Sequence, residues 1–389
     1  MSEQERYQFL SFNVNILKFL GLWPEDDKYQ KRLSYLRAVL IVTSAFPTCF
    51  GIYWSTMGIT DHHMDMVQKI QHVLASSCIA GAFYIAICFY HNRLEIRSLV
   101  DSIADFSKFS DLDPKSVDKK AVFTSKVLLA YTVIGILIYI GFPLLSISSC
   151  EAKDSLYLKK NGIPCGLILP VNLGFSYNDS PTFEMVGFFQ AEIGCLTSIV
   201  IVNMTMLVCG LLDHAIHQLK EVRKSMVNIG RCPEREIVDA LGFAIRYHCT
   251  VIDFIDQLNK SFGSQLVMHI TLTSLVISVL SFTILIVSQT ELIMYIPHLL
   301  GWLIILYNVC HHGQMLINES LGVAKDAYST PWYNYSVKIQ KDIKLVILRS
   351  QRPLTLKAMS FGILSESTFL RIISSAYSYF TLLLKMKTQ

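Results

Sequence analysis

The sequence predicts an all-α membrane protein with seven transmembrane helices, and two observations predict this fold class: the composition and the spacing of the apolar segments. Of the 389 residues, 52% are hydrophobic and 16% are charged, and the mean hydropathy is +0.42. Soluble domains usually contain about 25% charged residues. A helix needs about 20 apolar residues to cross the hydrocarbon core. Segments of this kind are Leu33–Met57, Val67–Tyr90, Val122–Ser148, Val186–Leu212, Phe262–Ser288, Ile293–Ile317 and the shorter Phe369–Leu384.

The distribution of lysine and arginine predicts the orientation. Of the 34 such residues, 25 precede the first span or lie in the connections after the second, fourth and sixth spans, and five lie in the alternate connections and the tail. Positively charged connections stay in the cytoplasm. We therefore expect a cytoplasmic N-terminus and an extracellular C-terminus. G-protein-coupled receptors have the opposite orientation, and their Asp-Arg-Tyr and Asn-Pro-x-x-Tyr motifs are missing from the third and seventh spans.

The connections on the predicted cytoplasmic side contain helical patterns of their own. Apolar residues recur at helical spacing between Asp213 and Lys260, with a break at Arg231-Cys232-Pro233, and again between Tyr333 and Arg349. These patterns predict helices that extend beyond the membrane and pack on one another. Independent basic helices on the inner leaflet are the alternative, because the same pattern suits a membrane surface.

The predicted extracellular loop, Ser149 to Met185, contains the cysteines that differ from the rest. Most of the ten cysteines lie inside apolar segments, where small buried side chains are the expected interpretation. Cys150 and Cys165 share this loop and are candidates for a disulfide. Asn178 begins a glycosylation sequon in the same loop, followed directly by Pro181. No signal peptide is predicted at the N-terminus, so we expect the first span to act as the signal anchor.

The last apolar segment contains a polar stripe. Arg371, Ser375, Ser378, Leu382 and Met386 recur at steps of three or four and share one helix face. The face begins charged, becomes lined by hydroxyl groups and ends with two bulky apolar residues, which is typical of a water path that narrows to a hydrophobic constriction. The alternative is a packed helix whose serines hydrogen-bond to their own backbone.

Neither a transporter nor an enzyme has a positive signal. The chain has no internal repeat of the kind that builds secondary transporters. Its adjacent histidine pairs, His62-His63 and His311-His312, diverge on a helix and do not readily share one metal ion. We expect binding rather than catalysis, with no metal and no cofactor.

The tail from Ser367 to Leu384, STFLRIISSAYSYFTLLL, resembles the C-terminal signature of insect odorant receptors. The segment Tyr377–Leu383 carries the specific Tyr-Ser-Tyr-Phe-Thr-Leu-Leu run, and Leu20-Gly21-Leu22-Trp23-Pro24 is similar to a short, weaker motif near their N-terminus. Length, span number and orientation agree along the whole chain. Gustatory receptors, which prefer a Gln-Phe pair in the last helix, are the alternative, and here Lys385-Met386 occupies that position.

The resemblance implies an odour-gated, non-selective cation channel in the plasma membrane of a sensory-neuron dendrite. In this family an odour-specific subunit assembles with a shared co-receptor, as a tetramer around one pore that the last helices line. The connection Asp213–Ser261 is much shorter than that of the co-receptor, which implies the odour-specific subunit. The hydrophobic gate then corresponds to Leu382 and Met386, with Ser375 and Ser378 on the same face. Lys385 departs from the co-receptor pattern near the pore mouth.

The resemblance also implies four regions. They are residues 1–32 as a cytoplasmic segment, 33–317 as a six-helix ligand-binding region with cytoplasmic extensions, 318–368 as a cytoplasmic anchor, and 369–389 as the pore helix and tail.

The same resemblance implies a pocket for a small volatile ligand in the outer half of the membrane, among spans two, three, four and six. Thr132, Gly135 and Tyr139 share one face of the third span, with Phe142 nearby. The glycine leaves space for a ligand or, alternatively, for a packed helix.

The other spans supply further candidates for this pocket. On the fourth span, Phe188, Glu192, Cys195 and Ile199 form a stripe, and an ionisable residue at membrane depth indicates function unless it is simply hydrated at a helix end. His72 on the second span is a candidate hydrogen-bond donor or a hydrated residue. Tyr295 and Leu299 share a face of the sixth, where Tyr295 is alternatively an interfacial aromatic residue.

Overall fold

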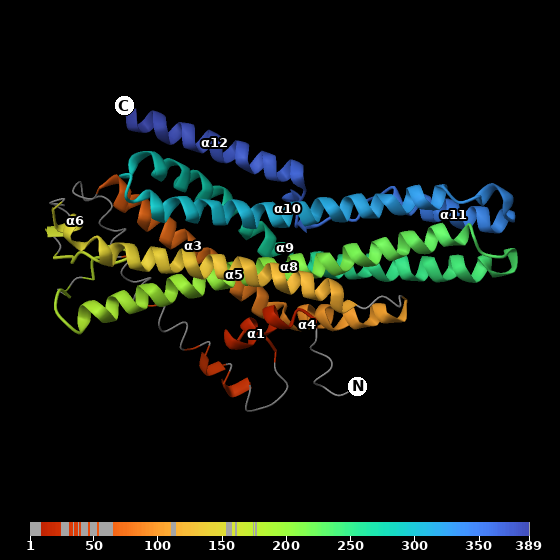
Figure 1. The fold of residues 1–389 in the computed structure, drawn as a ribbon, viewed down its shortest axis with the longest axis horizontal. Helices are drawn as coiled ribbons and strands as arrows, with labels where there is room; N and C mark the ends of the chain where they lie inside the picture. The colour runs from red at the N-terminus through yellow and green to blue at the C-terminus, as the bar shows by residue number, and fades with distance from the viewer. Residues whose placement is uncertain are drawn as a thin grey trace.

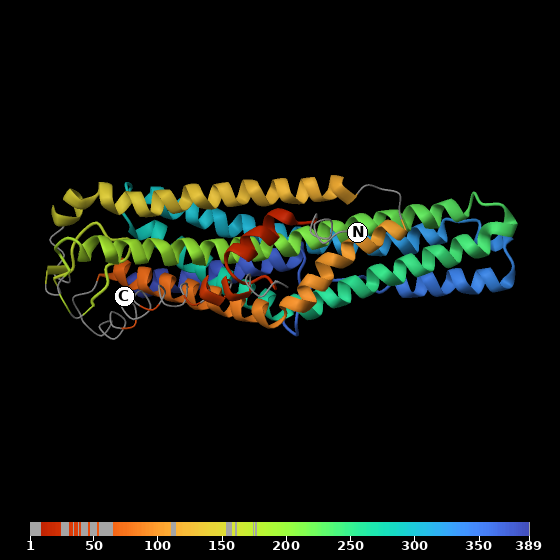
Figure 2. The same cartoon turned by 90° about the horizontal axis from the view of Figure 1, so that it is seen from below.

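The computed structural model describes residues 9–24, 31–33, 35–37, 39, 46, 53, 65–109, 114–152, 158–159, 162–173, 175 and 177–388. Within these residues the protein is an elongated bundle of long helices (Figures 1 and 2). The helices are α1 (Ser11–Phe19), α3 (Met66–His91), α4 (Arg93–Asp101), α5 (Pro114–Leu145), α6 (Ile147–Ala152), α8 (Thr182–Ile229), α9 (Ile237–Ile286), α10 (Leu292–Tyr328), α11 (Val337–Ser350) and α12 (Glu366–Thr388). Short 3-10 turns cover Ser102–Lys108, Glu234–Glu236 and Trp332–Asn334, and the strands β1 (Lys357–Ala358) and β2 (Gly362–Ile363) pair antiparallel.

Five of the described helices are long and apolar enough to cross a membrane: α3, α5, α8, α9 and α10. They correspond to the predicted spans two to six, and the chain is an all-α membrane protein. The first predicted span, Leu33–Met57, falls almost entirely outside the described residues. The helix α12 occupies the seventh position but is not among the five, because its serines and its charged residues Arg371, Lys385 and Lys387 lower its hydropathy.

The predicted extensions are continuous with the membrane helices. The helix α8 has 48 residues and α9 has 50, so each is roughly 70 Å long, more than twice the thickness of the hydrocarbon core. The two helices are separated at Arg231-Cys232-Pro233, as the sequence predicts. The second halves of α8 and α10 and the first half of α9 pack together with α11 at one end of the molecule, which we call the extended end (Figure 1). Independent surface helices are therefore the wrong interpretation.

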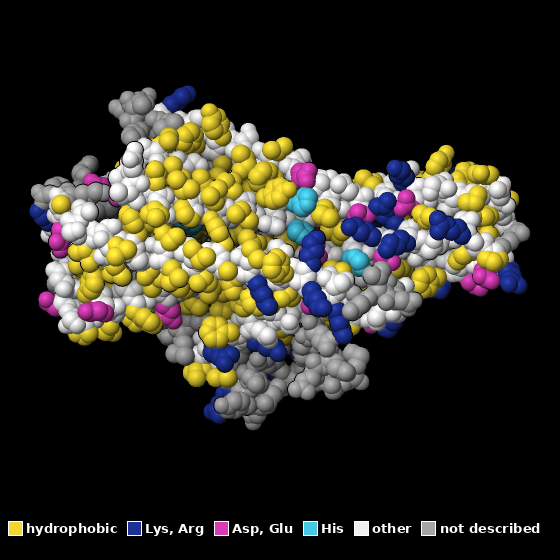
Figure 3. All heavy atoms as spheres, in the orientation of Figure 1, with side chains coloured by type: hydrophobic (Ala, Val, Ile, Leu, Met, Phe, Trp, Pro, Cys, Tyr) yellow, Lys and Arg dark blue, Asp and Glu magenta, His cyan; other side chains and the backbone are white. Residues whose placement is uncertain are grey.

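Charge separates the two halves of the molecule. Figure 3 shows hydrophobic side chains over the half that contains α3, α5 and α12, and lysine, arginine and acidic side chains over the extended end. In the extended end, Arg223 of α8 donates from Nη1 to Glu319 at 2.5 Å and from Nε to Asp326 at 2.6 Å, both on α10. Large apolar residues such as Ile87, Leu137 and Leu145 are exposed in the other half, as a lipid-facing surface requires.

The segment before α12 is fixed by close contacts to α9 and α10. The side chain of Asn259 on α9 donates to the Thr355 carbonyl at 2.9 Å and accepts from the Lys357 amide at 2.7 Å. A Cβ atom on Gly313 of α10 would lie 2.2 Å from the Leu364 carbonyl oxygen, so only glycine fits there. The start of α12 is therefore held against the bundle through backbone contacts.

The weak N-terminal motif has a structural reason. Gly21 has a φ of +71°, a conformation that side chains disfavour, and the residue that follows Leu22 is the buried Trp23. Asn13 of α1 donates to Asn203 of α8 at 3.0 Å, inside the bundle. The motif thus turns the chain and places an aromatic anchor in the core.

Candidate functional site

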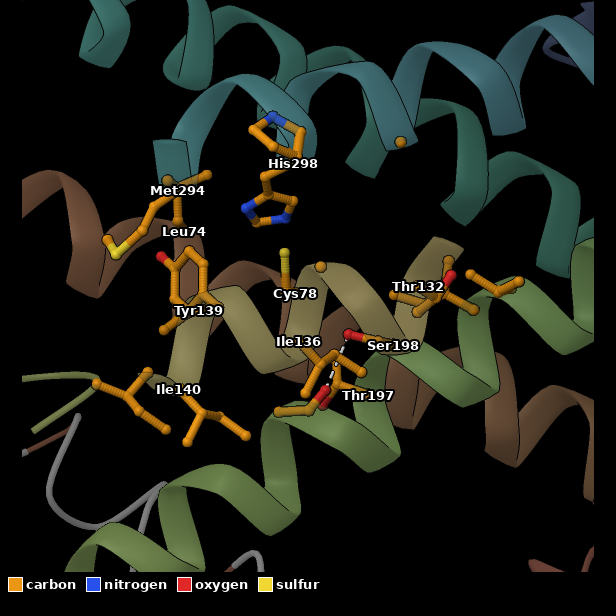
Figure 4. Close-up of a pocket in the computed structure, with 18 of the residues that line it drawn as sticks. Leu74, Cys78, Thr132, Ile136, Tyr139, Ile140, Thr197, Ser198, Met294 and His298 are labelled. Atoms are coloured by element: carbon orange, nitrogen blue, oxygen red, sulfur yellow. Dashed lines mark hydrogen bonds between the residues drawn. The ribbon is translucent and has the colours of Figure 1, made fainter. Parts of the chain in front are cut away.

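An apolar cavity of about 240 Å³ lies between α3, α5, α8 and α10 (Figure 4). These helices are spans two, three, four and six, which are the four that the resemblance implies. Two loop residues, Ile168 and Leu169, complete the wall, and the sequence did not indicate them. Among the 28 lining residues there is no lysine, arginine, aspartate or glutamate. A site of this kind accepts a small uncharged molecule, because an ionised group would be buried without a partner.

The third-span candidates lie where the sequence predicts. Thr132, Gly135 and Tyr139 of α5 all line the cavity. A Cβ atom on Gly135 would meet nothing within 4 Å, so this glycine leaves open space rather than a packing contact. The helix α5 is the least buried of the five membrane helices, and its inward face is correspondingly narrow. One stripe of the sequence was therefore enough to identify that face.

Most polar groups of the wall already have partners. Tyr131 donates to the Pro297 carbonyl at 2.6 Å, Thr132 to the Leu128 carbonyl at 2.8 Å, and Ser198 to the Gly194 carbonyl at 2.9 Å. Two neighbouring groups do not. Within the described part of the chain, neither the Tyr139 hydroxyl nor the His298 imidazole has a hydrogen-bond partner, and Nδ1 of His298 is buried.

Tyr139 and His298 lie next to each other across the cavity. Their ring centroids are 5.6 Å apart and the rings are nearly perpendicular, at 82°. Figure 4 shows the imidazole reaching from α10 into the space between Tyr139 and Cys78. The pair gives one end of an otherwise apolar cavity a local capacity to donate and accept hydrogen bonds.

A loop contributes Ile168 and Leu169 to the cavity wall and is held at several points. The side chain of Gln190 on α8 accepts from the Leu169 amide at 3.1 Å and donates to the Leu169 carbonyl at 2.8 Å. Tyr177 donates to the Val171 carbonyl. Cys150 and Cys165 form a disulfide with their Cα atoms 5.9 Å apart. Asn178 lies in the exposed part of this loop.

The structure does not bring the fourth-span stripe to the cavity. Phe188, Glu192, Cys195 and Ile199 lie on the far side of α8 from the residues that line it, and Phe188 is 66% exposed. The helix α8 is the most buried of the five and is apolar on several sides, so periodicity alone could not identify the inward face. The residues that line the cavity from α8 are Gln190, Ala191, Ile193, Gly194, Thr197, Ser198, Ile201 and Val202.

Four further candidates lie near the cavity without lining it. His72 is fully buried in α3, and Phe142 and Leu299 pack against the core. Tyr295 is buried and accepts a hydrogen bond at 2.8 Å from Gln71, which does line the cavity. Tyr295 is thus a supporting residue rather than an interfacial aromatic residue.

His298 and Gln190 are the functional candidates that sequence reasoning missed. Both are polar residues inside apolar spans, a signal that indicates function at membrane depth. His298 directly follows Pro297, the only proline within the described α10. Applying the same criterion to every span would have selected both residues.

The predicted pore face of α12 is exposed in the single chain. Arg371, Ser375, Ser378 and Leu382 are exposed, whereas Ile372 and Ala376 on the other side are buried against the bundle. Ser378 donates to the Ser374 carbonyl at 3.0 Å, as the packed-helix alternative expects. Exposure of the stripe, however, leaves it open to water or to another subunit. The side chain of Met386 lies outside the described residues.

The adjacent histidines of α10 diverge as predicted. Nδ1 of His311 lies 3.1 Å from Glu366 at the start of α12, and Nε2 of His312 lies 3.3 Å from Asp213 of α8. The described residues contain no group of three or more histidine, cysteine or acidic residues that could hold a metal ion. The pair therefore connects α10 with two helices, one of them α12.

Comparison with known proteins decides the family. Residues 65–377 match the sequence model of the 7tm odorant receptor family, which is most of the chain. The chain belongs to the insect odorant receptor family. It is a chemoreceptor of the membrane, and the family is one of receptors and ion channels rather than enzymes.

Individual odorant receptors are distant relatives of this one. Odorant receptor 67c of Drosophila melanogaster is 28% identical over 150 residues, 39% of this chain and 37% of the relative. Odorant receptor 85c of the same species is 20% identical over 379 residues, 95% of this chain and 86% of the relative. The first of these alignments therefore spans just over a third of the relative's length.

A solved odorant receptor has the same fold. The structure of OR5 from Machilis hrabei in complex with eugenol has a TM-score of 0.78 to this receptor, with 14% sequence identity, and covers 98% of this chain and all of its own. At this identity the likeness establishes the fold alone, including its seven transmembrane helices.

Proposed function

We propose that this receptor is an odour-specific subunit that binds a small volatile molecule in the cavity and, together with a co-receptor, opens a non-selective cation channel. The apolar cavity between α3, α5, α8 and α10 carries this proposal. Its volume of about 240 Å³ lies between the cavity of about 150 Å³ that holds benzene and the 300 Å³ or more of drug-sized sites. Eugenol in the complex of Machilis hrabei OR5 supports a small organic ligand for this fold.

The exposed face of α12 supports the channel part of the proposal. A stripe that carries Ser375 and Ser378 and then Leu382 suits a water path with a hydrophobic constriction, and the single chain leaves it uncovered. We propose that the α12 helices of four subunits line one pore, with Leu382 and Met386 as the gate. The short connection between α8 and α9 supports the odour-specific subunit rather than the co-receptor.

Opening requires that the ligand binds one arrangement of the helices better than the other. The cavity and α12 share α10, since Met294, His298 and Trp302 line the cavity and His311 contacts Glu366 at the start of α12. We propose that a shift of α10 carries the binding event to the gate. The predicted orientation, with a cytoplasmic extended end and an extracellular C-terminus, places the cavity near the outer face, in the plasma membrane of a sensory dendrite.

Recording currents from cells that express this chain, with and without an insect co-receptor, tests the proposal. The recordings use a panel of volatile compounds while G-protein signalling is blocked. A rapid cation current in co-expressing cells alone is the expected result. A current from this chain alone would favour a homomeric, gustatory-type receptor, and silence to the whole panel despite surface expression would contradict the odorant-gated function.

A further inference from the structure

One part of the cavity wall contains two adjacent polar side chains without a hydrogen-bond partner among the described residues. Tyr139 presents a phenol and His298 presents an imidazole, at 5.6 Å between ring centroids. Elsewhere in the wall, the hydroxyl groups of Tyr131, Thr132 and Ser198 donate to backbone carbonyls. A buried donor or acceptor without a partner is costly, so this end of the cavity favours a ligand that supplies one.

We propose that Tyr139 and His298 form a hydrogen-bonding subsite that selects ligands with a neutral hydroxyl group on a small apolar body, that is, alcohols and phenols. The proposal rests on the ligand-gated function proposed above. The rings are close enough for one head group to face both. The rest of the wall is mostly apolar and includes Leu74, Ile79 and Ile136, which offer apolar contact to the body of the ligand.

The chemistry of the pair distinguishes a hydroxyl from other oxygen functions. A neutral imidazole has one donor and one acceptor nitrogen, and a phenol both donates and accepts. A ligand hydroxyl also does both, so it pairs with the imidazole in either tautomer and with the phenol. An ether oxygen only accepts, and a hydrocarbon leaves both protein groups unpaired. Carboxylates and ammonium groups are excluded because no residue of opposite fixed charge lines the wall.

Two series of compounds with matched numbers of non-hydrogen atoms test this selectivity. One is 1-octanol, 1-methoxyheptane and nonane, and the other is 4-ethylphenol, 4-methylanisole and 1-ethyl-4-methylbenzene. Dose–response curves are recorded from the receptor with its co-receptor. We expect the hydroxyl compound of at least one series to act at a concentration about tenfold lower than its ether and its hydrocarbon.

Substitutions test whether Tyr139 and His298 are responsible for the selectivity for hydroxyl compounds. Tyr139→Phe removes only the hydroxyl and keeps the ring contact, and His298→Phe keeps an aromatic ring of similar shape. Each variant should raise the effective concentration of the hydroxyl compound about tenfold and leave that of the hydrocarbon within about twofold, so that selectivity is lost. Tyr328→Phe, which removes a hydroxyl from an exposed tyrosine at the far end of α10, is the matched control. It should leave the effective concentrations of the hydroxyl compound and of the hydrocarbon unchanged.

The outcomes separate this proposal from the proposed function. Equal potency of hydroxyl, ether and hydrocarbon compounds, or equal losses for all three in Tyr139→Phe, would overturn the hydroxyl subsite while the odour-gated channel stands. If His298→Phe fails to reach the cell surface, Tyr139→Phe alone decides. No current to any compound of either series, or to the volatile panel above, would overturn both proposals.

Discussion

At the scale of single residues, Gly135 controls the space in the cavity. The structure leaves more than 4 Å around the position of its missing Cβ atom, inside the cavity wall. Gly135→Leu should therefore fill the cavity without displacing a helix. We expect larger ligands to lose potency by about tenfold or more while smaller ones lose less, because even one methylene in an apolar site changes binding by about 10- to 200-fold.

The control for Gly135→Leu lies on the same helix. Gly141 of α5 also has nothing within 4 Å of a Cβ atom, but it does not line the cavity. Gly141→Leu should leave dose–response curves unchanged at equal surface expression. A loss of potency that is the same for small and large ligands, or the same in both variants, would contradict the assignment of Gly135 to the ligand space.

The protonation of His248 should make the stability of the extended end depend on pH. Burial first, and the positive charge of Arg349 on α11 second, lower the pKa of its imidazole to about 4. In the unfolded chain His248 is protonated below about pH 6.5, whereas in the folded protein it stays neutral down to about pH 4. The stability contribution of the neutral imidazole is complete above pH 6.5 and is lost as the pH falls towards 4, to a total of about 3 kcal/mol.

Thermal unfolding of the purified receptor in detergent between pH 4 and pH 7.5 measures this dependence. The wild-type midpoint should fall steeply below pH 6.5, and His248→Gln should flatten the profile in that window while lowering the midpoint at neutral pH. His91→Gln, at an exposed histidine, should keep the wild-type profile. Identical pH profiles for His248→Gln and wild type would show that other groups govern the acid sensitivity.

At the scale of elements, the junction between α10 and the segment before α12 is the tightest contact on the way to the proposed pore. A Cβ atom on Gly313 would overlap the Leu364 carbonyl, which is backbone and cannot rotate away. Gly313→Ala should therefore displace the start of α12 and disturb the contact of His311 with Glu366. We expect altered basal current or a loss of odour-evoked current of tenfold or more, together with a lower unfolding temperature.

Gly141→Ala is the comparison for this junction, since a methyl group there meets open space. It should retain wild-type currents and unfolding temperature. Wild-type gating in Gly313→Ala at normal surface expression would mean that α12 does not depend on its seating against α10, and the proposed route from cavity to gate would then be wrong.

At the scale of the whole molecule, the single chain buries only one side of α12. The bundle covers Ile372 and Ala376 of α12 and leaves Leu382 55% exposed. In the proposed tetramer this exposed face meets the pore axis. Leu382→Ala should weaken the hydrophobic constriction and raise the leak current in the absence of odour several-fold, because a wider and less apolar constriction dewets less readily.

Leu370→Ala provides the control at this scale. Leu370 is also an exposed leucine of α12, but helical spacing places it about 120° away from the stripe of Ser375, Ser378 and Leu382. Basal and odour-evoked currents of Leu370→Ala with the co-receptor should match wild type. Unchanged leak in Leu382→Ala would remove this residue from the gate.

The sequence by itself determined the fold class, most of the membrane helices and the family. These depend on long apolar segments and on the tail motif, which are properties of contiguous residues and can be recognised without any knowledge of packing. It also identified the inward face of α5, because that peripheral helix buries only a narrow side. The pairing of Cys150 with Cys165 needed only that both share one loop.

The tertiary structure alone decided which face of the buried α8 lines the cavity. It also decided that Leu169 lines the cavity and is hydrogen-bonded to Gln190, and that Tyr139 and His298 are neighbours. A helix surrounded by others is apolar on all sides, so its sequence carries no directional signal. Tyr139 and His298 are 159 positions apart. Their proximity depends on how α5 and α10 pack across the bundle, and local periodicity does not encode the packing of helices that are distant in the chain.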